Sequence, residues 1–213
     1  MTKKALALEV VKRLKEEYPD STCTLDYDQA WKLLVSVRLA AQCTDKRVNE
    51  IVPFLFERYP SIEALAQAEE LDIYDIIKPC GLGKSKAKDI KACMMALHYD
   101  FKDNVPDNMK DLLSLPGVGR KSANLIMGDV YGQPAIVTDT HCIRLSNRIG
   151  LVDQEKDPKK VEMLLKKIVP ENESNEFCHR LVDHGRTVCT ARTAPLCQLC
   201  VLADICKYKQ RGE

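Results

Sequence analysis

The stretch Leu115-Pro116-Gly117-Val118-Gly119-Arg120-Lys121-Ser122-Ala123 predicts a tight hairpin that leads directly into a helix. Pro116 fixes its own φ and ends the preceding element, while Gly117 and Gly119 are expected to supply the positive φ values of a tight turn. An apolar run with helical spacing follows: Ala123, Leu125, Ile126 and Val130. Backbone amides at a helix N-terminus bind anions, so Gly117, Val118 and Gly119 are candidates for holding one phosphate. A glycine pair also makes ordinary turns.

A second informative stretch is Val137-Thr138-Asp139-Thr140-His141. Asp139 precedes a helical pattern that extends to Ile149, so its carboxylate is expected to cap that helix. A capping aspartate can also be catalytic. Lys121 falls in the first turn of the helix after the hairpin, where it is either a surface lysine that binds phosphate or a nucleophile. His141 is either a structural hydrogen-bonding group or a phosphate contact.

The rest of the chain is predicted to be helical, and the fold class is all-α. Apolar residues recur with helical spacing, and no stretch rich in Val, Ile and Thr alternates for long enough to make a strand. Expected caps are Asp28, Thr44 or Asp45, and Ser61. The predicted helices cover residues 4–18, 61–68, 71–77, 85–99, 107–113, 139–149, 158–168 and 174–188, and three more begin at Asp28, at Thr44 or Asp45, and after Gly119.

Composition indicates a soluble, intracellular protein. The 213 residues are 45% hydrophobic with a net charge of +1, so a nucleic-acid partner would need basic residues gathered on one face. No signal peptide and no apolar membrane span is expected. The densest basic patch is predicted around a second glycine turn, residues 80–83, and its lysines are Lys78, Lys84, Lys86, Lys88 and Lys91.

Four of the ten cysteines crowd the C-terminus with seven, two and five residues between them: Cys189, Cys197, Cys200 and Cys206. Four thiolates can hold a tetrahedral zinc or a [4Fe–4S] cluster, and the spacing alone leaves both open. The other six are expected to be small buried hydrophobic residues: Cys23, Cys43, Cys80, Cys93, Cys142 and Cys178.

The strings LPGVGRKSAN and VTDTH resemble the helix-hairpin-helix superfamily of base-excision DNA glycosylases, and within it the endonuclease III family. The likeness covers essentially the whole chain. It implies a helical domain over residues 22–133 that contains the hairpin, and an iron–sulfur domain built from 1–21 plus 134–213. Double-stranded DNA would lie in the cleft between them. The resemblance favours [4Fe–4S] over zinc.

The same resemblance implies roles for individual residues. Lys121 would be the nucleophile that forms a Schiff base with deoxyribose, because lysine at this place marks members that also cleave the strand. Asp139 would stabilise the cationic sugar and help to move protons. The implied DNA contacts are Gln42 as gap filler, Leu82 as wedge, the hairpin amides, Lys84, His141 and Arg192. The first gap between cysteines has seven residues where relatives have six, which lengthens the loop that carries Arg192.

The resulting hypothesis is a DNA repair enzyme, a DNA N-glycosylase and abasic-site lyase, that removes oxidised pyrimidines and cleaves the strand by β-elimination. Its expected partner is duplex DNA with damaged bases or abasic sites, and it is expected to be a cytoplasmic, nucleoid-associated monomer. One alternative is a monofunctional mismatch glycosylase. Another is a non-catalytic DNA-binding protein that senses redox state through its cluster.

Overall fold

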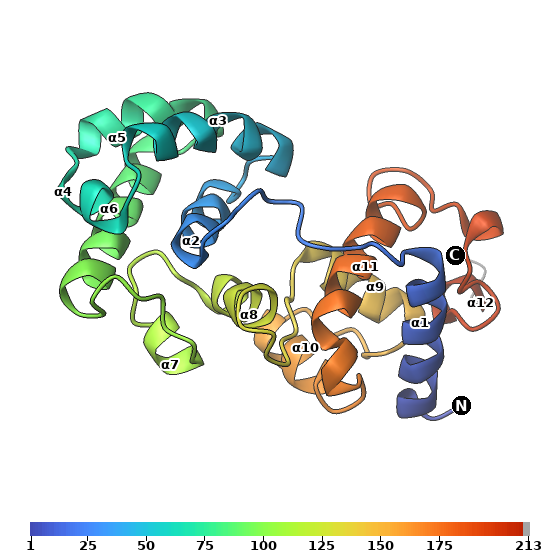
Figure 1. Cartoon of the computed structure of the whole chain (residues 1–213). Coiled ribbons are helices and arrows are strands. Elements are labelled where there is room, and N and C mark those ends of the chain that lie inside the picture. Colours follow the sequence, from blue (N-terminus) through green and yellow to red (C-terminus); the bar gives the residue numbers. More distant parts are fainter. Residues whose placement is uncertain (211–213) are drawn as a thin grey trace. The chain divides into compact units, whose positions relative to one another are not determined.

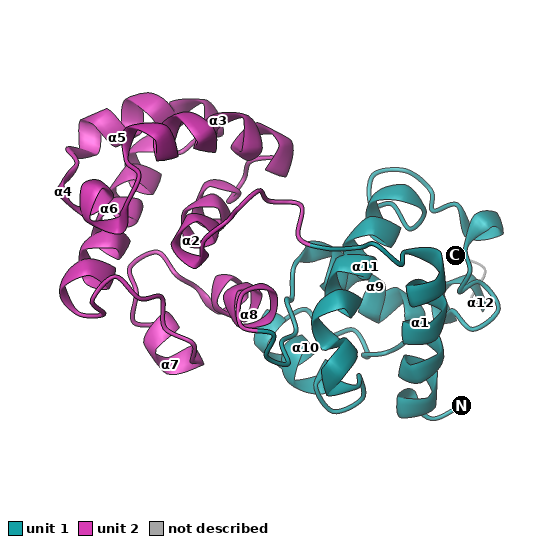
Figure 2. Ribbon diagram, viewed as in Figure 1, with its two compact units in different colours: residues 1–22, 132–213 teal, residues 23–131 magenta. Residues whose placement is uncertain are grey.

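The computed structural model describes residues 1–210, and the prediction of an all-α fold is confirmed: within this range the regular elements are helices and there is no strand (Figure 1). None of the helices in residues 1–210 is long and apolar enough to cross a membrane. The chain forms two compact units, Cys23–Tyr131 and the combination of Met1–Thr22 with Gly132–Glu213 (Figure 2). The last part of the expected cluster domain, 211–213, lies outside the described residues.

The unit Cys23–Tyr131 is held together by one apolar core. Helix α6 packs against α4, α5 and α2, while α2 also contacts α3 and α8. Core residues with no exposed surface include Leu33, Leu55, Ile73, Met94 and Ile126, and each such side chain contributes about 1.5–3 kcal/mol to folding. Its helices are α2 (Ala30–Leu39), α3 (Asp45–Arg58), α4 (Ile62–Gln67), α5 (Glu70–Ile77), the 3-10 helix η1 (Lys78–Cys80), α6 (Gly83–Tyr99), α7 (Met109–Leu112) and α8 (Arg120–Asp129).

The other unit is organised around α11, which packs against both α1 and α9. Val10, Leu145 and Phe177 come from these three helices and have no exposed surface. Its elements are α1 (Lys3–Glu17), α9 (Thr140–Ile149), α10 (Pro158–Leu165), η2 (Glu171–Glu173), α11 (Ser174–Thr187), η3 (Cys197–Leu199) and α12 (Lys207–Gln210).

Two of the three expected caps in the first half of the chain are confirmed, and one prediction is wrong. The Thr44 and Ser61 hydroxyls accept bonds from the amides three residues on, at 3.3 and 3.1 Å. Asp28 is not a cap, because Gln29 occupies the N-cap position of α2. The Asp28 carboxylate instead pairs with Lys32 at 2.8 Å, and this hydrogen-bonded ammonium lowers the pKa of Asp28.

Candidate functional site

The predicted hairpin is present, but only one of its two glycines has a positive φ. Gly117 adopts φ +73°, and the Val118 N–H closes the turn by donating to the Leu115 carbonyl at 3.2 Å. Gly119 is the N-cap of α8 with φ −96° and ψ 174°, which is extended backbone open to any residue. The expectation of a positive φ at Gly119 was therefore wrong, because the chain completes its reversal at Gly117.

The hairpin rests on a half-buried ion pair that joins α2 to α6. Arg38 donates to the Asp89 carboxylate from Nε at 2.8 Å and from Nη2 at 2.5 Å. A Cβ on Gly117 would lie 2.9 Å from Asp89 Cβ and 3.4 Å from Arg38 Cδ. Because Gly117 has no Cβ, the hairpin backbone packs directly against this ion pair. The contact fixes the position of the hairpin relative to α2 and α6.

The N-terminus of α8 presents backbone donors and one lysine. Among residues 1–210, no acceptor is found for the Gly117 and Gly119 amides, whereas the Val118 amide is used within the turn. Lys121 is exposed in the first turn of α8, while Ala123 and Ile126 on the same helix are fully buried. Donors and a cation at a helix N-terminus favour an anionic ligand.

The two hairpin glycines should respond differently to substitution. Gly117→Ala is expected to lower the free energy of unfolding by about 1–3 kcal/mol, because alanine is strained at positive φ and its Cβ meets Asp89. Gly119→Ala has extended backbone and no atom within 4 Å of the new Cβ, so its loss should come only from alanine being a poorer N-cap than glycine and should stay below about 1 kcal/mol. Urea unfolding of both variants measures this. Equal losses in the two variants would contradict the assigned packing.

Four exposed, non-glycine residues of the same unit have left-handed backbone: Lys102 and Asp103, which are adjacent, and two that end or begin a helix connection, Gln42 and Leu82. Gln42 follows α2 with φ 58°, and Leu82 precedes α6 with φ 51°. Leu82 is 55% exposed although it is apolar, and Gln42 is also exposed. Strained backbone of this kind costs about 1–3 kcal/mol and concentrates at functional sites.

Four of the five lysines predicted for the basic patch are exposed or half-buried, and the fifth is fully buried. Lys78, Lys84 and Lys88 are exposed and Lys91 is half-buried, as a basic surface requires. Lys86 is fully buried, so its assignment to this surface was wrong. Its Nζ donates to the carbonyls of Leu39 and Cys80 at 2.7 and 2.8 Å.

In the other unit, Asp139 is held by its own helix and by α11. Its Oδ1 accepts the Cys142 amide at 2.7 Å, which confirms Asp139 as the N-cap of α9. The segment that leads to Asp139 is buried and anchored to α11, because Ala135 N donates to Ser174 Oγ at 3.1 Å and Val137 N donates to Cys178 Sγ at 3.2 Å. Asp139 is half-buried, with its side chain bonded to the start of α9 and the preceding segment anchored to α11.

His141 is packed tightly against α11. A Cβ on Gly185 would lie 2.4 Å from His141 Nδ1, so only glycine permits this approach. Arg144 Nη2 lies 3.2 Å from the same nitrogen and also donates to the Gly185 and Cys189 carbonyls. Arg144 and Gly185 therefore enclose the Nδ1 side of the His141 ring.

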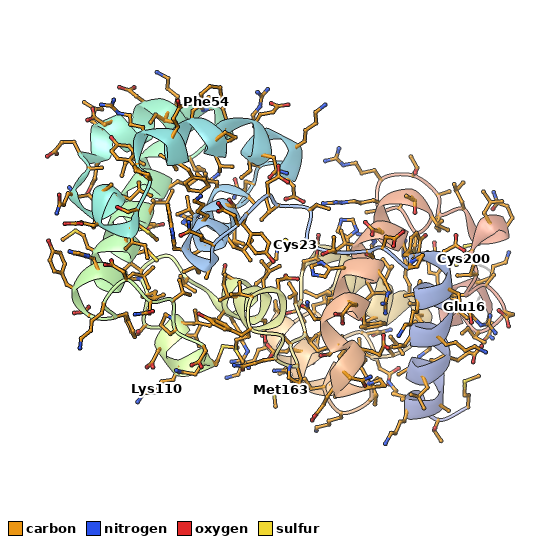
Figure 3. The ribbon with its side chains drawn as sticks, in the orientation of Figure 1. Glu16, Cys23, Phe54, Lys110, Met163 and Cys200 are labelled. Carbon is orange, nitrogen blue, oxygen red and sulfur yellow. The ribbon has the colours of Figure 1, made fainter. Side chains whose placement is uncertain are left out.

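The C-terminal cysteine quartet lines one small cavity of about 20 Å³, in which apolar side chains such as Leu145 and Leu202 complete the wall. Cys200, labelled in Figure 3, is one of the four cysteines that come together here from the segment 189–206. Burial raises the pKa of the Cys200 thiol to about 11. Within residues 1–210, no three His, Cys, Asp or Glu side chains are grouped closely enough to hold a single metal ion.

Polar groups around this cavity are directed at the sulfurs. Arg148 Nη1 donates to Cys189 Sγ at 3.2 Å, and the Leu202 amide donates to Cys200 Sγ at 3.4 Å. His184 Nε2 lies 3.3 Å from Cys200 Sγ, and burial lowers the pKa of His184 to about 4, which keeps the ring neutral. Hydrogen bonds to sulfur stabilise thiolates that hold a cluster.

The loop between Cys189 and Cys197, the first two cysteines of the quartet, is stabilised by hydrogen bonds within itself. Leu196 N donates to Val188 O at 3.0 Å and closes its base, while Thr190 Oγ1 lies 2.9 Å from Thr193 Oγ1. Arg192 is exposed between these two threonines. The longer gap is therefore accommodated as a closed loop with an outward arginine.

Sequence reasoning missed the residues that support the site rather than form it. These are Arg38, Arg148, Ser174, His184 and Gly185. Their partners lie more than 15 residues away along the chain, so no local pattern marks them. The one available signal was polarity, because Ser174 and His184 lie with Arg180 on the buried face of α11 among apolar residues such as Phe177 and Leu181.

Comparison with known proteins identifies the family. The family model described as "HhH-GPD superfamily base excision DNA repair protein" matches residues 35–171. Endonuclease III of Synechocystis sp. is 43% identical over 210 residues, which cover 98% of this chain and 95% of that protein. Endonuclease III of Escherichia coli K12 is 38% identical over 212 residues, 98% of each chain. A solved trapped covalent intermediate of endonuclease III and DNA matches with a TM-score of 0.93 at 32% identity, covering 100% of this chain and 99% of that one. The chain belongs to the HhH-GPD superfamily of base excision DNA repair proteins.

Proposed function

We propose that this protein excises oxidised pyrimidines from duplex DNA and then cleaves the abasic strand by β-elimination. The observation that carries the proposal is the exposed Lys121 on the first turn of α8, directly after a hairpin with available amides. The family membership supports it, and one similar solved structure is a covalent intermediate between endonuclease III and DNA. With DNA as substrate, the protein is expected at the chromosome, in the cytoplasm.

Lys121 is proposed as the nucleophile. Its Nζ forms a bond to C1′ of the damaged nucleotide while the C1′–base bond breaks and the base leaves with a proton. The C1′–O4′ bond then breaks and O4′ takes a proton, which gives an open-chain iminium ion that acidifies the C2′ proton. Loss of that proton breaks the C3′–oxygen bond on the 3′ side, and water then releases the sugar fragment from the amine.

Asp139 is proposed as the carboxylate that stabilises this chemistry. Its Oδ1 is engaged with the Cys142 amide, and the second oxygen can accept or return a proton. A fixed negative charge also favours the cationic sugar that develops as the base departs. The anchoring of residues 135 and 137 on α11 supports this role, because catalysis by charge requires a group that does not move.

The proposed DNA contacts are made by backbone amide donors, by cationic side chains and by the two exposed turns that contain Gln42 and Leu82. The Gly117 and Gly119 amides bind one phosphate, the Val118 amide being used to close the turn. Lys84, Arg192 and the Nε2 side of His141 are proposed backbone contacts. Extrusion of a nucleotide leaves a hole in the stack, and Gln42 and Leu82 are the exposed residues proposed to fill and hold it.

A [4Fe–4S] cluster is proposed as the resident group of the cysteine cavity. Cys189, Cys197, Cys200 and Cys206 would be its ligands, and the donors Arg148 and Leu202 suit thiolate sulfurs. When bound, the cluster would supply a rigid cross-link among four points of the segment 189–206. Cys189 and Cys197 are the two ends of the loop that displays Arg192.

Replacing one ligand should remove the cluster. Cys197→Ser is expected to give a protein without the brown visible absorption and with iron and sulfide well below about four per chain. Cys23→Ser is the matched control, since Cys23 is half-buried in the other unit and should leave the colour unchanged. Absorption spectra and iron analysis check both. A colourless wild-type protein that contains zinc would refute the iron–sulfur assignment.

One gel experiment tests the proposed activity against its alternatives. Duplexes with an oxidised pyrimidine, an A or T mismatch, or an abasic site are incubated with protein and run under denaturing conditions. The proposal expects strand cleavage at the oxidised pyrimidine and at the abasic site without added base. Cleavage only after hot alkali at a mismatch would indicate a monofunctional glycosylase. Binding without base release from any lesion would indicate a non-catalytic DNA-binding protein.

A further inference from the structure

Lys86 is a fully buried ammonium group bound by two backbone carbonyls. Its Nζ donates to Leu39 O at 2.7 Å and to Cys80 O at 2.8 Å. Burying an ammonium group is costly unless hydrogen bonds compensate, and burial lowers the pKa of Lys86. Its neighbours Lys84 and Lys88 are exposed on the same helix. A methionine or leucine would fill this space without that cost, so the ammonium needs a specific reason.

The two carbonyls belong to the ends of the elements that precede the strained turns. Leu39 is the last residue of α2, and Gln42 follows three residues later with φ 58°. Cys80 is the last residue of η1, and Leu82 follows two residues later with φ 51°. A cation at these ends satisfies carbonyls that the helices leave without partners.

Further contacts join the same two turns. Burial, and next the nearby Cys43 thiol, raise the pKa of Cys80 to about 11, so the two cysteines are close neighbours, one residue from Gln42 and two from Leu82 respectively. The Lys86 backbone N–H also donates to Leu82 O at 3.1 Å. Lys86 therefore contacts the turn at 80–82 through both its backbone and its side chain, and reaches the end of α2 with the same ammonium.

We propose that Lys86 is a positioning residue whose buried ammonium ties the turn after α2 to the turn before α6, so that Gln42 and Leu82 are presented to DNA as one rigid unit. This inference rests on the proposed function. Leu82 has a strained, exposed backbone conformation. The hydrogen bonds that Lys86 makes to this turn limit the relaxation that the strain would otherwise cause. Lys86 itself touches neither the substrate nor the reacting atoms.

The test compares two abasic substrates that differ only in base pairing. In one, the abasic site lies in a fully paired duplex. In the other, it lies in a short unpaired bubble, where no stack has to be opened or filled. Lys86→Met keeps the side-chain length but removes the donors, and its single-turnover cleavage rate should fall about 10- to 100-fold on the paired duplex. On the bubble the rate should change by less than about threefold.

Lys88→Met is the matched control, because it removes the same charge from an exposed position two residues away on α6. It should affect both substrates equally and weakly. Lys86→Gln, which retains two N–H donors, should recover part of the duplex rate. Equal losses of Lys86→Met on the two substrates, or no loss, would overturn the proposal, as would loss of the folded state in both Lys86 variants. Failure of the proposed function is separate, since the wild type would then cleave neither substrate.

Discussion

Lys121→Ala should abolish strand cleavage and the covalent adduct that borohydride traps with an oxidised-pyrimidine duplex. Hydride adds to the iminium carbon and converts a transient lysine–sugar link into a stable amine, so the adduct requires this amine. Removal of a nucleophile typically costs a factor of about 10³ or more in rate. Single-turnover cleavage and a denaturing protein gel after borohydride measure the two effects.

The loss should not come from unfolding or from failure to bind DNA. Lys121 is exposed at the start of α8, and alanine is favourable in a helix, so stability should stay within about 0.5 kcal/mol. Lys110→Ala is the matched control, since Lys110 is an exposed lysine on the neighbouring α7 (Figure 3). It should keep full activity. An undiminished adduct with Lys121→Ala would remove Lys121 from the mechanism.

Features encoded within a few residues could be predicted from the sequence. Thr44, Ser61 and Asp139 each cap a helix by accepting an amide three residues on, so the complete interaction lies within four residues. Gly117 in the hairpin is similar, because the turn itself requires its positive φ. The predicted cap at Asp28 was wrong although aspartate is a good capping residue, because Lys32 lies one helical turn away and pairs with the Asp28 carboxylate.

Features decided by distant partners could not be predicted. Lys86 is surrounded in sequence by surface lysines, and its burial depends on the Leu39 carbonyl, which is 47 residues away. The local sequence does not distinguish Gly117 from Gly119, but only at Gly117 would an added Cβ contact Asp89. Cys178 was expected to be a buried apolar residue, and it is buried, yet its sulfur also accepts the Val137 amide on the segment that leads to Asp139.

Asp139→Asn should separate the structural role of this residue from its chemical one. Asparagine caps helices about as well as aspartate, so the bond to the Cys142 amide at 2.7 Å can be kept by the amide oxygen. Base release should fall by a factor of about 10²–10³ because the fixed negative charge is lost. The fall should be smaller on a preformed abasic site, where no base has to be displaced.

Asp139→Ala, in contrast, removes both the cap and the charge. Asp139→Ala should lose about 1 kcal/mol of stability through the cap, whereas Asp139→Asn should lose only the charge–dipole part, about 0.3–1 kcal/mol and less at high salt. If both variants lose base release equally while only alanine is clearly destabilised, the carboxylate acts through its charge. If Asp139→Asn releases base at the wild-type rate, Asp139 is a helix cap alone, and the carboxylate of the mechanism must be sought elsewhere.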